Sequence, residues 1–177
     1  MFYLLFLLFS IVNSENCVCT TVTCPVVGEN YINMGNGNAD VYYYYENHGT
    51  YNVVSKAHAT ITHYSLDNGT ETTSCTQKYS RLLDDETQEC DAGHILANRL
   101  GGYGNQPLNI FPQNASINRG SYKEMEAQIY DCMIENNIGY LSWIFYYEDN
   151  NKTKPYQVDY QANFDFYCKE IINSFSN

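Results

Sequence analysis

Positive charge is scarce in this sequence. Its 177 residues include 9 Lys and Arg against 20 Asp and Glu, for a formal net charge of −11 with neutral histidines. Proteins that hold a nucleic-acid backbone usually rely on clustered Lys and Arg. The composition therefore predicts weak non-specific affinity for polyanions and excludes a surface that is basic throughout. Between Asp91 and Glu126, however, three positive residues balance three negative ones.

Long apolar runs are missing as well. The most apolar stretch, Phe2 to Val12, is 11 residues long, which is too short to span a bilayer. At the extreme N-terminus such a stretch is typical of a signal peptide, although no Lys or Arg precedes it. We expect cleavage after Ser14, so that residues 1–14 are a signal peptide and residues 15–177 form a single secreted domain.

Cysteine is not scarce. The chain has seven cysteines, which in an oxidising compartment indicate disulfide bonds. Spacing favours the pairs Cys75–Cys90 and Cys132–Cys168. The other three lack the spacing of a zinc site and leave one thiol over; they are Cys17, Cys19 and Cys24.

Three Asn-x-Ser/Thr sequons occur, at Asn68, Asn114 and Asn151. Secretion from a eukaryotic cell would make them glycosylation sites. Asn68 and Asn151 lie in turn-like contexts and are the better acceptors. A glycan on Asn114 would stand inside the segment that carries the candidate chemistry.

Residue patterns predict strands in the first half of the chain. Val41–Glu46 is rich in tyrosine, and Val53–Leu66 combines β-branched residues with partial alternation, so both are typical of strands. The turn sequence Asp67–Gly69 then predicts a hairpin that returns along Thr70–Tyr79.

The second half predicts one central helix, a late hairpin and a terminal helix. Asn118 is a suitable N-cap for a helix that reaches Glu135, with apolar residues at three- and four-residue spacing. Leu141–Tyr147 and Pro155–Tyr160 predict a hairpin, and Phe164–Phe175 a short helix held by a disulfide. The mixture predicts an α+β fold with antiparallel hairpins around a central helix.

Two features between Asp91 and Glu126 suggest chemistry. His94 is neutral near physiological pH and suits the role of a general base for water. Asn118 and Glu126 share a helical face two turns apart, where a carbonyl and a carboxylate could address one Mg²⁺ and its water shell. Spacing alone still favours an ordinary helix cap and a solvated carboxylate.

Three short elements taken together resemble the DNA/RNA non-specific endonuclease family, whose active site is the ββα-metal site, or His-Me finger. The elements are D-x-G-H, N-x-x-P-Q, and an Asn followed by an aromatic residue at +4 and a Glu at +8. The resemblance covers about 36 residues and is strongest to a bacterial-toxin-like branch with the sequence DAGH. The matching residues are Asp91, Gly93, His94, Asn109, Pro112, Gln113, Asn118, Tyr122 and Glu126.

The resemblance implies a catalytic role for each polar residue. His94 would be the general base that activates the attacking water. Asn118 would bind Mg²⁺ directly, with Mn²⁺ as an alternative ion, and Glu126 would hold a water of that ion. Asn109 would support the shell of the histidine or the metal, and Asp91 would orient the loop.

Substrate contacts follow less directly. Arg99 or Arg119 could clamp a phosphate, or either could be an ordinary surface cation. Ala92 stands where many family members have an arginine that binds phosphate. The lack of this arginine could weaken turnover, unless Arg99 takes over its role. The resemblance implies DNA and RNA as substrates and allows an inhibitor or immunity partner, which no residue requires. The alternative is a catalytically weak or inactive, disulfide-stapled secreted binding protein on the same scaffold, which the acidic charge would suit.

Overall fold

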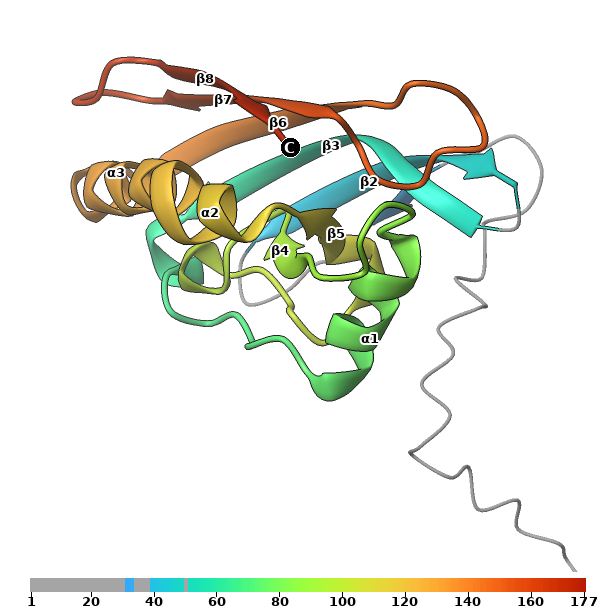
Figure 1. Ribbon diagram of the computed structural model, residues 1–177. Helices are drawn as coiled ribbons and strands as arrows, with labels where there is room; N and C mark the ends of the chain where they lie inside the picture. The colour runs from blue at the N-terminus through green and yellow to red at the C-terminus, as the bar shows by residue number, and fades with distance from the viewer. Residues whose placement is uncertain (1–30, 34–38, 50) are drawn as a thin grey trace, which may run out of the picture.

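A six-stranded antiparallel sheet runs through the molecule (Figure 1). The computed structural model describes residues 31–33, 39–49 and 51–177, so the expected signal peptide and the three N-terminal cysteines lie outside the described residues. The strands follow the order β1-β2-β3-β6-β7-β8, and every neighbouring pair is antiparallel. Their bounds are β1 Tyr31–Asn33, β2 Asp40–His48, β3 Tyr51–Thr62, β6 Ile138–Tyr146, β7 Gln157–Phe164 and β8 Ile171–Ser176.

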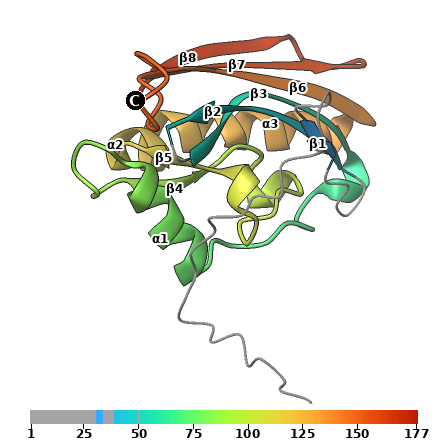
Figure 2. The ribbon, with the colours of Figure 1, turned by 90° about the vertical axis from the view of Figure 1, so that its right-hand side faces the viewer.

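A second layer covers one face of this sheet (Figures 1 and 2). It holds a two-stranded hairpin, β4 (Asp91–His94) with β5 (Ile110–Gln113), and the helix α1 (Ser74–Leu83) beside it. A helical stretch with a kink at Gly120 follows β5, and short 3₁₀ turns connect the elements. The helical stretch comprises α2 Ala115–Ile117, a π-helical turn Asn118–Tyr122 and α3 Lys123–Glu135, and the 3₁₀ turns are His63–Ser65, Asn98–Leu100 and Pro107–Asn109.

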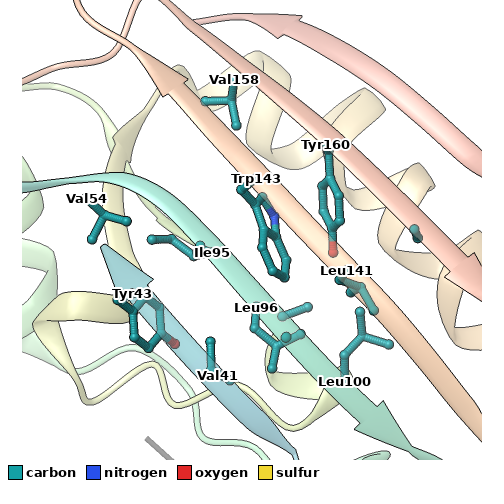
Figure 3. Close-up of a cluster of buried hydrophobic side chains, with 14 of the residues drawn as sticks. Val41, Tyr43, Val54, Ile95, Leu96, Leu100, Leu141, Trp143, Val158 and Tyr160 are labelled. Atoms are coloured by element: carbon teal, nitrogen blue, oxygen red, sulfur yellow. The ribbon is translucent and has the colours of Figure 1, made fainter. Parts of the chain in front are cut away.

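The core lies between the two layers (Figure 3). Strands bury alternate residues, as Val41 and Tyr43 do on β2, while their neighbours face solvent. Trp143 on β6 is fully buried, and its indole N–H donates to the Tyr122 hydroxyl at 3.2 Å. Burying a large side chain contributes about 1.5–3 kcal/mol. The contact fixes Tyr122, and with it the start of α3, against the sheet.

The sheet confirms two predicted strands and the late hairpin. Val41–Glu46 lies within β2, Val53–Leu66 largely within β3, and Leu141–Tyr147 and Pro155–Tyr160 fall in the β6–β7 hairpin. The predicted α+β class, with antiparallel hairpins around a central helix, is confirmed too. Within the described residues, no helix is both long and apolar enough to cross a bilayer.

The predicted strand Thr70–Tyr79 is wrong, because most of it lies in α1. Thr73 caps this helix in a capping box with Thr76. The Thr73 hydroxyl accepts from the backbone N–H of Thr76, and the Thr76 hydroxyl accepts from the backbone N–H of Thr73. Thr70 makes only an isolated parallel bridge to Tyr103. A Thr-x-x-Thr cap is weaker as a sequence signal than the Asp67–Gly69 turn that suggested a returning strand.

The predicted terminal helix over Phe164–Phe175 is also wrong. The chain forms β8 there, which adds an edge strand to β7. The adjacent residues Ile171 and Ile172 are β-branched, which favours a strand over a helix. Its predicted disulfide, Cys132–Cys168, is formed.

The predicted Cys75–Cys90 disulfide is not formed. Cys90 is a buried thiol whose sulfur lies 3.4 Å from the Ser80 hydroxyl. Ser80 is five residues beyond Cys75 on α1, about 7.5 Å along the helix axis. Cys90 therefore packs against α1 at Ser80, more than one helical turn beyond Cys75.

The helix before α3 begins earlier than predicted. Asn114 caps it by accepting from the Ser116 N–H at 3.1 Å, and Asn118 ends this first short helix, two residues before the kink at Gly120. Asn118 is therefore not the N-cap. The helix does end at Glu135, as predicted. Because the cap is supplied upstream, the Asn118 side chain is available for other contacts.

Candidate active site

Asp91, Asn118 and Arg119 meet at the start of β4. The Asn118 side-chain amide donates to Asp91 Oδ2 at 3.1 Å, and Arg119 donates twice to the carboxylate, at 2.7 and 2.6 Å. Burial raises the pKa of Asp91, but the bonds from Arg119 and Asn118 and the charges of Arg119 and Arg81 outweigh it and lower the pKa. Asp91 is therefore ionised and fixes the direction of the Asn118 amide.

His94 ends β4 with one ring nitrogen held by the backbone. Its Nε2 lies 3.4 Å from the carbonyl oxygen of Thr70, which can only accept, so this nitrogen carries the proton and Nδ1 has the free lone pair. Burial lowers the pKa of His94, although the Thr70 carbonyl and Glu71 oppose the shift. A Cβ on Gly104 would lie 2.5 Å from Nε2, so the glycine lets the chain approach the ring. The imidazole is neutral and ready to accept a proton.

Glu126 lies on α3 beside Arg99. Burial raises the pKa of Glu126 to about 8, while the charges of Lys123 and Arg99 oppose that shift. Arg99 is itself positioned: its guanidinium lies 3.9 Å above the Tyr130 ring, and its Nε is 4.0 Å from Asp67. Arg99 thus contributes a fixed positive charge near Glu126.

Asn109 is a buried anchor for the chain after His94. Its Oδ1 accepts from the Leu96 N–H and the Tyr43 hydroxyl, both at 2.8 Å. Its Nδ2 donates to the carbonyls of Leu96 at 2.9 Å and Tyr103 at 3.3 Å. All its hydrogen-bonding capacity is used in this way. Asn109 therefore supports the loop next to the base and does not face substrate.

Gln113 is the last residue of β5, and its side chain packs against Gly93 of β4. Its side chain is fully buried, and a Cβ on Gly93 would lie 2.3 Å from its Oε1, so only glycine fits there. Within the described part of the chain neither polar atom of the Gln113 amide has a hydrogen-bond partner. Close packing against Gln113 therefore explains why the third position of the D-x-G-H element is a glycine.

These residues fit a hard divalent cation. The side-chain N–H of Asn118 is directed to Asp91, so its side-chain oxygen Oδ1 points away with no protein partner among the described residues. Glu126 likewise makes no hydrogen bond or ion pair within the described ranges, although its surroundings disfavour a bare negative charge. No group of three His, Cys, Asp or Glu side chains converges in that part of the structure. Such a sparse oxygen donor set suits Mg²⁺, which keeps several waters.

Sequence reasoning missed the residues that surround the motif. Arg81 on α1 lies near Asp91, and Asp67 and Tyr130 hold Arg99 from the loop after β3 and from α3. Tyr130 lies four residues beyond Glu126, so the helical period could have placed it on the same face. Arg81 had no such signal, because it lies beyond the predicted strand Thr70–Tyr79 and the sequence patterns do not predict α1.

The three sequon asparagines are exposed: Asn68, Asn114 and Asn151. Asn114 also caps the helix before Asn118, so it lies close to the site in sequence. The Asn68 side chain donates to the Tyr64 carbonyl at 2.7 Å. Glycosylation at these positions stays a prediction.

A β-hairpin whose first strand ends in a histidine, followed by a helical segment with Asn and Glu, is the arrangement of ββα-metal nucleases. The sequence comparison agrees with this class. The chain belongs to the DNA/RNA non-specific endonuclease family, whose sequence model matches residues 30–164.

One curated relative is a protein described as probable deoxyribonuclease RhsA from Dickeya dadantii (strain 3937). It is 36% identical over 115 residues, which are 65% of this chain. The chain spans only 8% of the length of that relative.

Solved structures share the fold at low identity. NucA from Streptococcus agalactiae without bound metal has a TM-score of 0.56 and 14% identity, over 84% of this chain and 77% of that chain. The same protein with a magnesium ion bound has a TM-score of 0.54 and 12% identity, over 92% and 89%.

Proposed function

We propose that this chain is a secreted, Mg²⁺-dependent endonuclease that hydrolyses phosphodiester bonds of DNA and RNA with little selection for base or sugar. The observation that carries the proposal is the hydrogen bond from Asn118 to Asp91, on the same strand that ends in His94. It directs an amide oxygen outward as a cation ligand, and burial keeps the base at the end of that strand neutral.

The residues have distinct tasks in this reaction. Nδ1 of His94 takes a proton from a water molecule while the water oxygen bonds to phosphorus. The bond from phosphorus to the leaving oxygen breaks, and that oxygen takes a proton from solvent. Asn118 would hold the cation through its carbonyl oxygen, and Glu126 through a bound water. When bound, the divalent ion neutralises charge on the phosphate and stabilises the leaving oxygen. Mn²⁺ suits the same oxygen donors.

Secretion has its own support. The Cys132–Cys168 disulfide joins α3 to the loop before β8, and structural disulfides persist in oxidising compartments. The exposed sequons are consistent with that route. The N-terminal apolar stretch would supply the signal peptide.

Digestion of supercoiled plasmid and of a structured RNA tests the activity. We expect cleavage with Mg²⁺ and none with EDTA, and a loss of at least about 100-fold in His94→Ala. His63→Ala, which changes an exposed histidine after β3, is the matched control and should cleave normally.

A folded wild-type protein that cleaves neither substrate with Mg²⁺ or Mn²⁺ would contradict the proposal. DNA binding without turnover would then favour the binding protein on the same scaffold. Cleavage that persists in EDTA would leave a nuclease but remove the metal from its mechanism.

A further inference from the structure

A polar cavity opens beside the candidate active site. It has a volume of about 260 Å³ and lies between α1 and the segment that carries Asn118 and Arg119, next to the first half of β4. Figure 1 shows α1 beside the β4–β5 hairpin. The polar side chains that line it are Thr72, Gln77, Arg81, Asp91, Asn118 and Arg119.

The charges around this cavity differ from those of the whole chain. Arg119 and Asp91 neutralise each other through their two hydrogen bonds. Arg81 is exposed on α1 and has no hydrogen bond or ion pair among the described residues. The cavity therefore carries one net positive charge, in a protein whose formal net charge is −11.

Further hydrogen-bond donors lie on the same side of α1. Gln77 and Arg81 are one helical turn apart, and the Gln77 amide donates to the Thr72 hydroxyl at 3.2 Å. The second amide hydrogen of Gln77 and the Thr72 hydroxyl stay available as donors. A guanidinium that donates no hydrogen bond within the described residues, together with two neutral donors, is a set that recognises a phosphate oxyanion.

We propose that this cavity, with Arg81 as its principal contact, binds a phosphate that neighbours the scissile phosphate on the substrate strand. This inference rests on the proposed function and extends it to substrate positioning. His94 does not line the cavity; it lies two residues along β4 from Ala92 and three from Asp91, roughly 7–10 Å at the rise of a strand. A general base acts within about 3 Å. The phosphate in the cavity is therefore a flanking one.

Binding measurements test the subsite without turnover. Fluorescein-labelled duplex DNA is titrated by anisotropy with the full His94→Ala protein in Mg²⁺, alone and combined with Arg81→Gln or Arg81→Lys. We expect Arg81→Gln to weaken binding about 10-fold, the effect of losing a hydrogen bond to a charged group. The slope of log K against log salt should fall in magnitude by about 0.9, for one lost phosphate contact. Arg81→Lys should restore most of the salt slope.

Lys78→Gln is the matched control. It removes the same charge from the same helix, at an exposed residue that does not line the cavity. We expect less than a twofold change in affinity. Equal weakening by Lys78→Gln and Arg81→Gln, or no detectable DNA binding by the His94→Ala protein, would overturn the subsite.

Cleavage kinetics separate the subsite from the proposed function. With wild-type His94, Arg81→Gln should raise KM on duplex DNA about 10-fold and change kcat little. It should leave cleavage of a substrate with a single phosphodiester unchanged. If the protein cleaves DNA and Arg81→Gln behaves as wild type, the subsite is wrong and the nuclease stands. If no variant cleaves but Arg81→Gln still weakens binding selectively, the subsite stands and the proposed catalysis fails.

Discussion

Asn118 donates its side-chain amide to Asp91 Oδ2 at 3.1 Å, across 27 residues of sequence. The bond joins the start of β4 to the helical stretch before α3. An ionised carboxylate accepts only, so it selects the amide orientation that turns the Asn118 oxygen outward. The cation ligand is therefore positioned by a residue that need not touch the cation.

Asp91→Ala should lower metal affinity without removing any ligand. Loss of a residue that orients a metal ligand costs about 10–100-fold in affinity or activity. Isothermal titration with Mn²⁺ measures the change. Asp159→Ala is the control, since this carboxylate on β7 contacts Ser174 and Tyr146 and lies away from the hairpin. Unchanged Mn²⁺ affinity in Asp91→Ala would show that Asn118 needs no support.

Activity should persist at mildly acidic pH. Burial lowers the pKa of His94 below its usual 6.5, so the base stays neutral until the pH falls below this lowered pKa. We expect the acid limb of kcat/KM to have its midpoint below 6.5. Because protonation of the buried ring is disfavoured, the same group should destabilise the fold only as the pH falls below 6.5. A midpoint above 7 would contradict the burial argument.

Glu126→Gln should stabilise the metal-free protein at high pH. Burial raises the pKa of Glu126 from 4.5 to about 8, so the folded state binds this proton more tightly than the unfolded state. The stability it contributes is complete below pH 4.5 and is lost as the pH rises through about 8. In EDTA, the Tm advantage of Glu126→Gln over wild type should grow by about 2–4 °C or more from pH 6 to pH 9.

The control for this test is Glu124→Gln, which changes an exposed glutamate on the same helix. Its Tm difference from wild type should not depend on pH in that way. With Mg²⁺ present, the Glu126→Gln advantage should shrink, because the cation favours the ionised carboxylate of the wild type. A pH-independent advantage would show that Glu126 is ordinarily solvated.

Asn109→Ala should cost stability before it costs chemistry. The substitution leaves the Leu96 N–H and C=O and the Tyr43 hydroxyl without their partner in the core. An unsatisfied buried group costs about 1–3 kcal/mol, so we expect a total of roughly 3 kcal/mol or more by urea denaturation. Asn105→Ala, at an exposed residue of the same loop, should change stability little. A stable Asn109→Ala protein without activity would instead indicate a direct catalytic role.

The candidate site was predictable where chemistry follows local spacing. Asp91 and His94 are the first and last residues of one strand, so their order along the chain suffices to relate them. Asn118 and Glu126 do not share one unbroken helical face as expected, because the chain kinks at Gly120 between them. The terminal helix and the strand after Asp67 were predicted wrongly because sheet pairing and a threonine cap outweighed the local pattern.

By itself the sequence determined the alternation of the strands, the composite motif and the one segment where charges of both signs balance. Those features depend on residues within a few turns or strand positions of each other. Only the tertiary structure decided that Asn114 caps the helix while Asn118 turns to Asp91, and that Arg81 faces the same cavity. The reason is physical: these contacts depend on how α1, the hairpin and the helical stretch pack against one sheet, and burial and packing carry no local period in the chain.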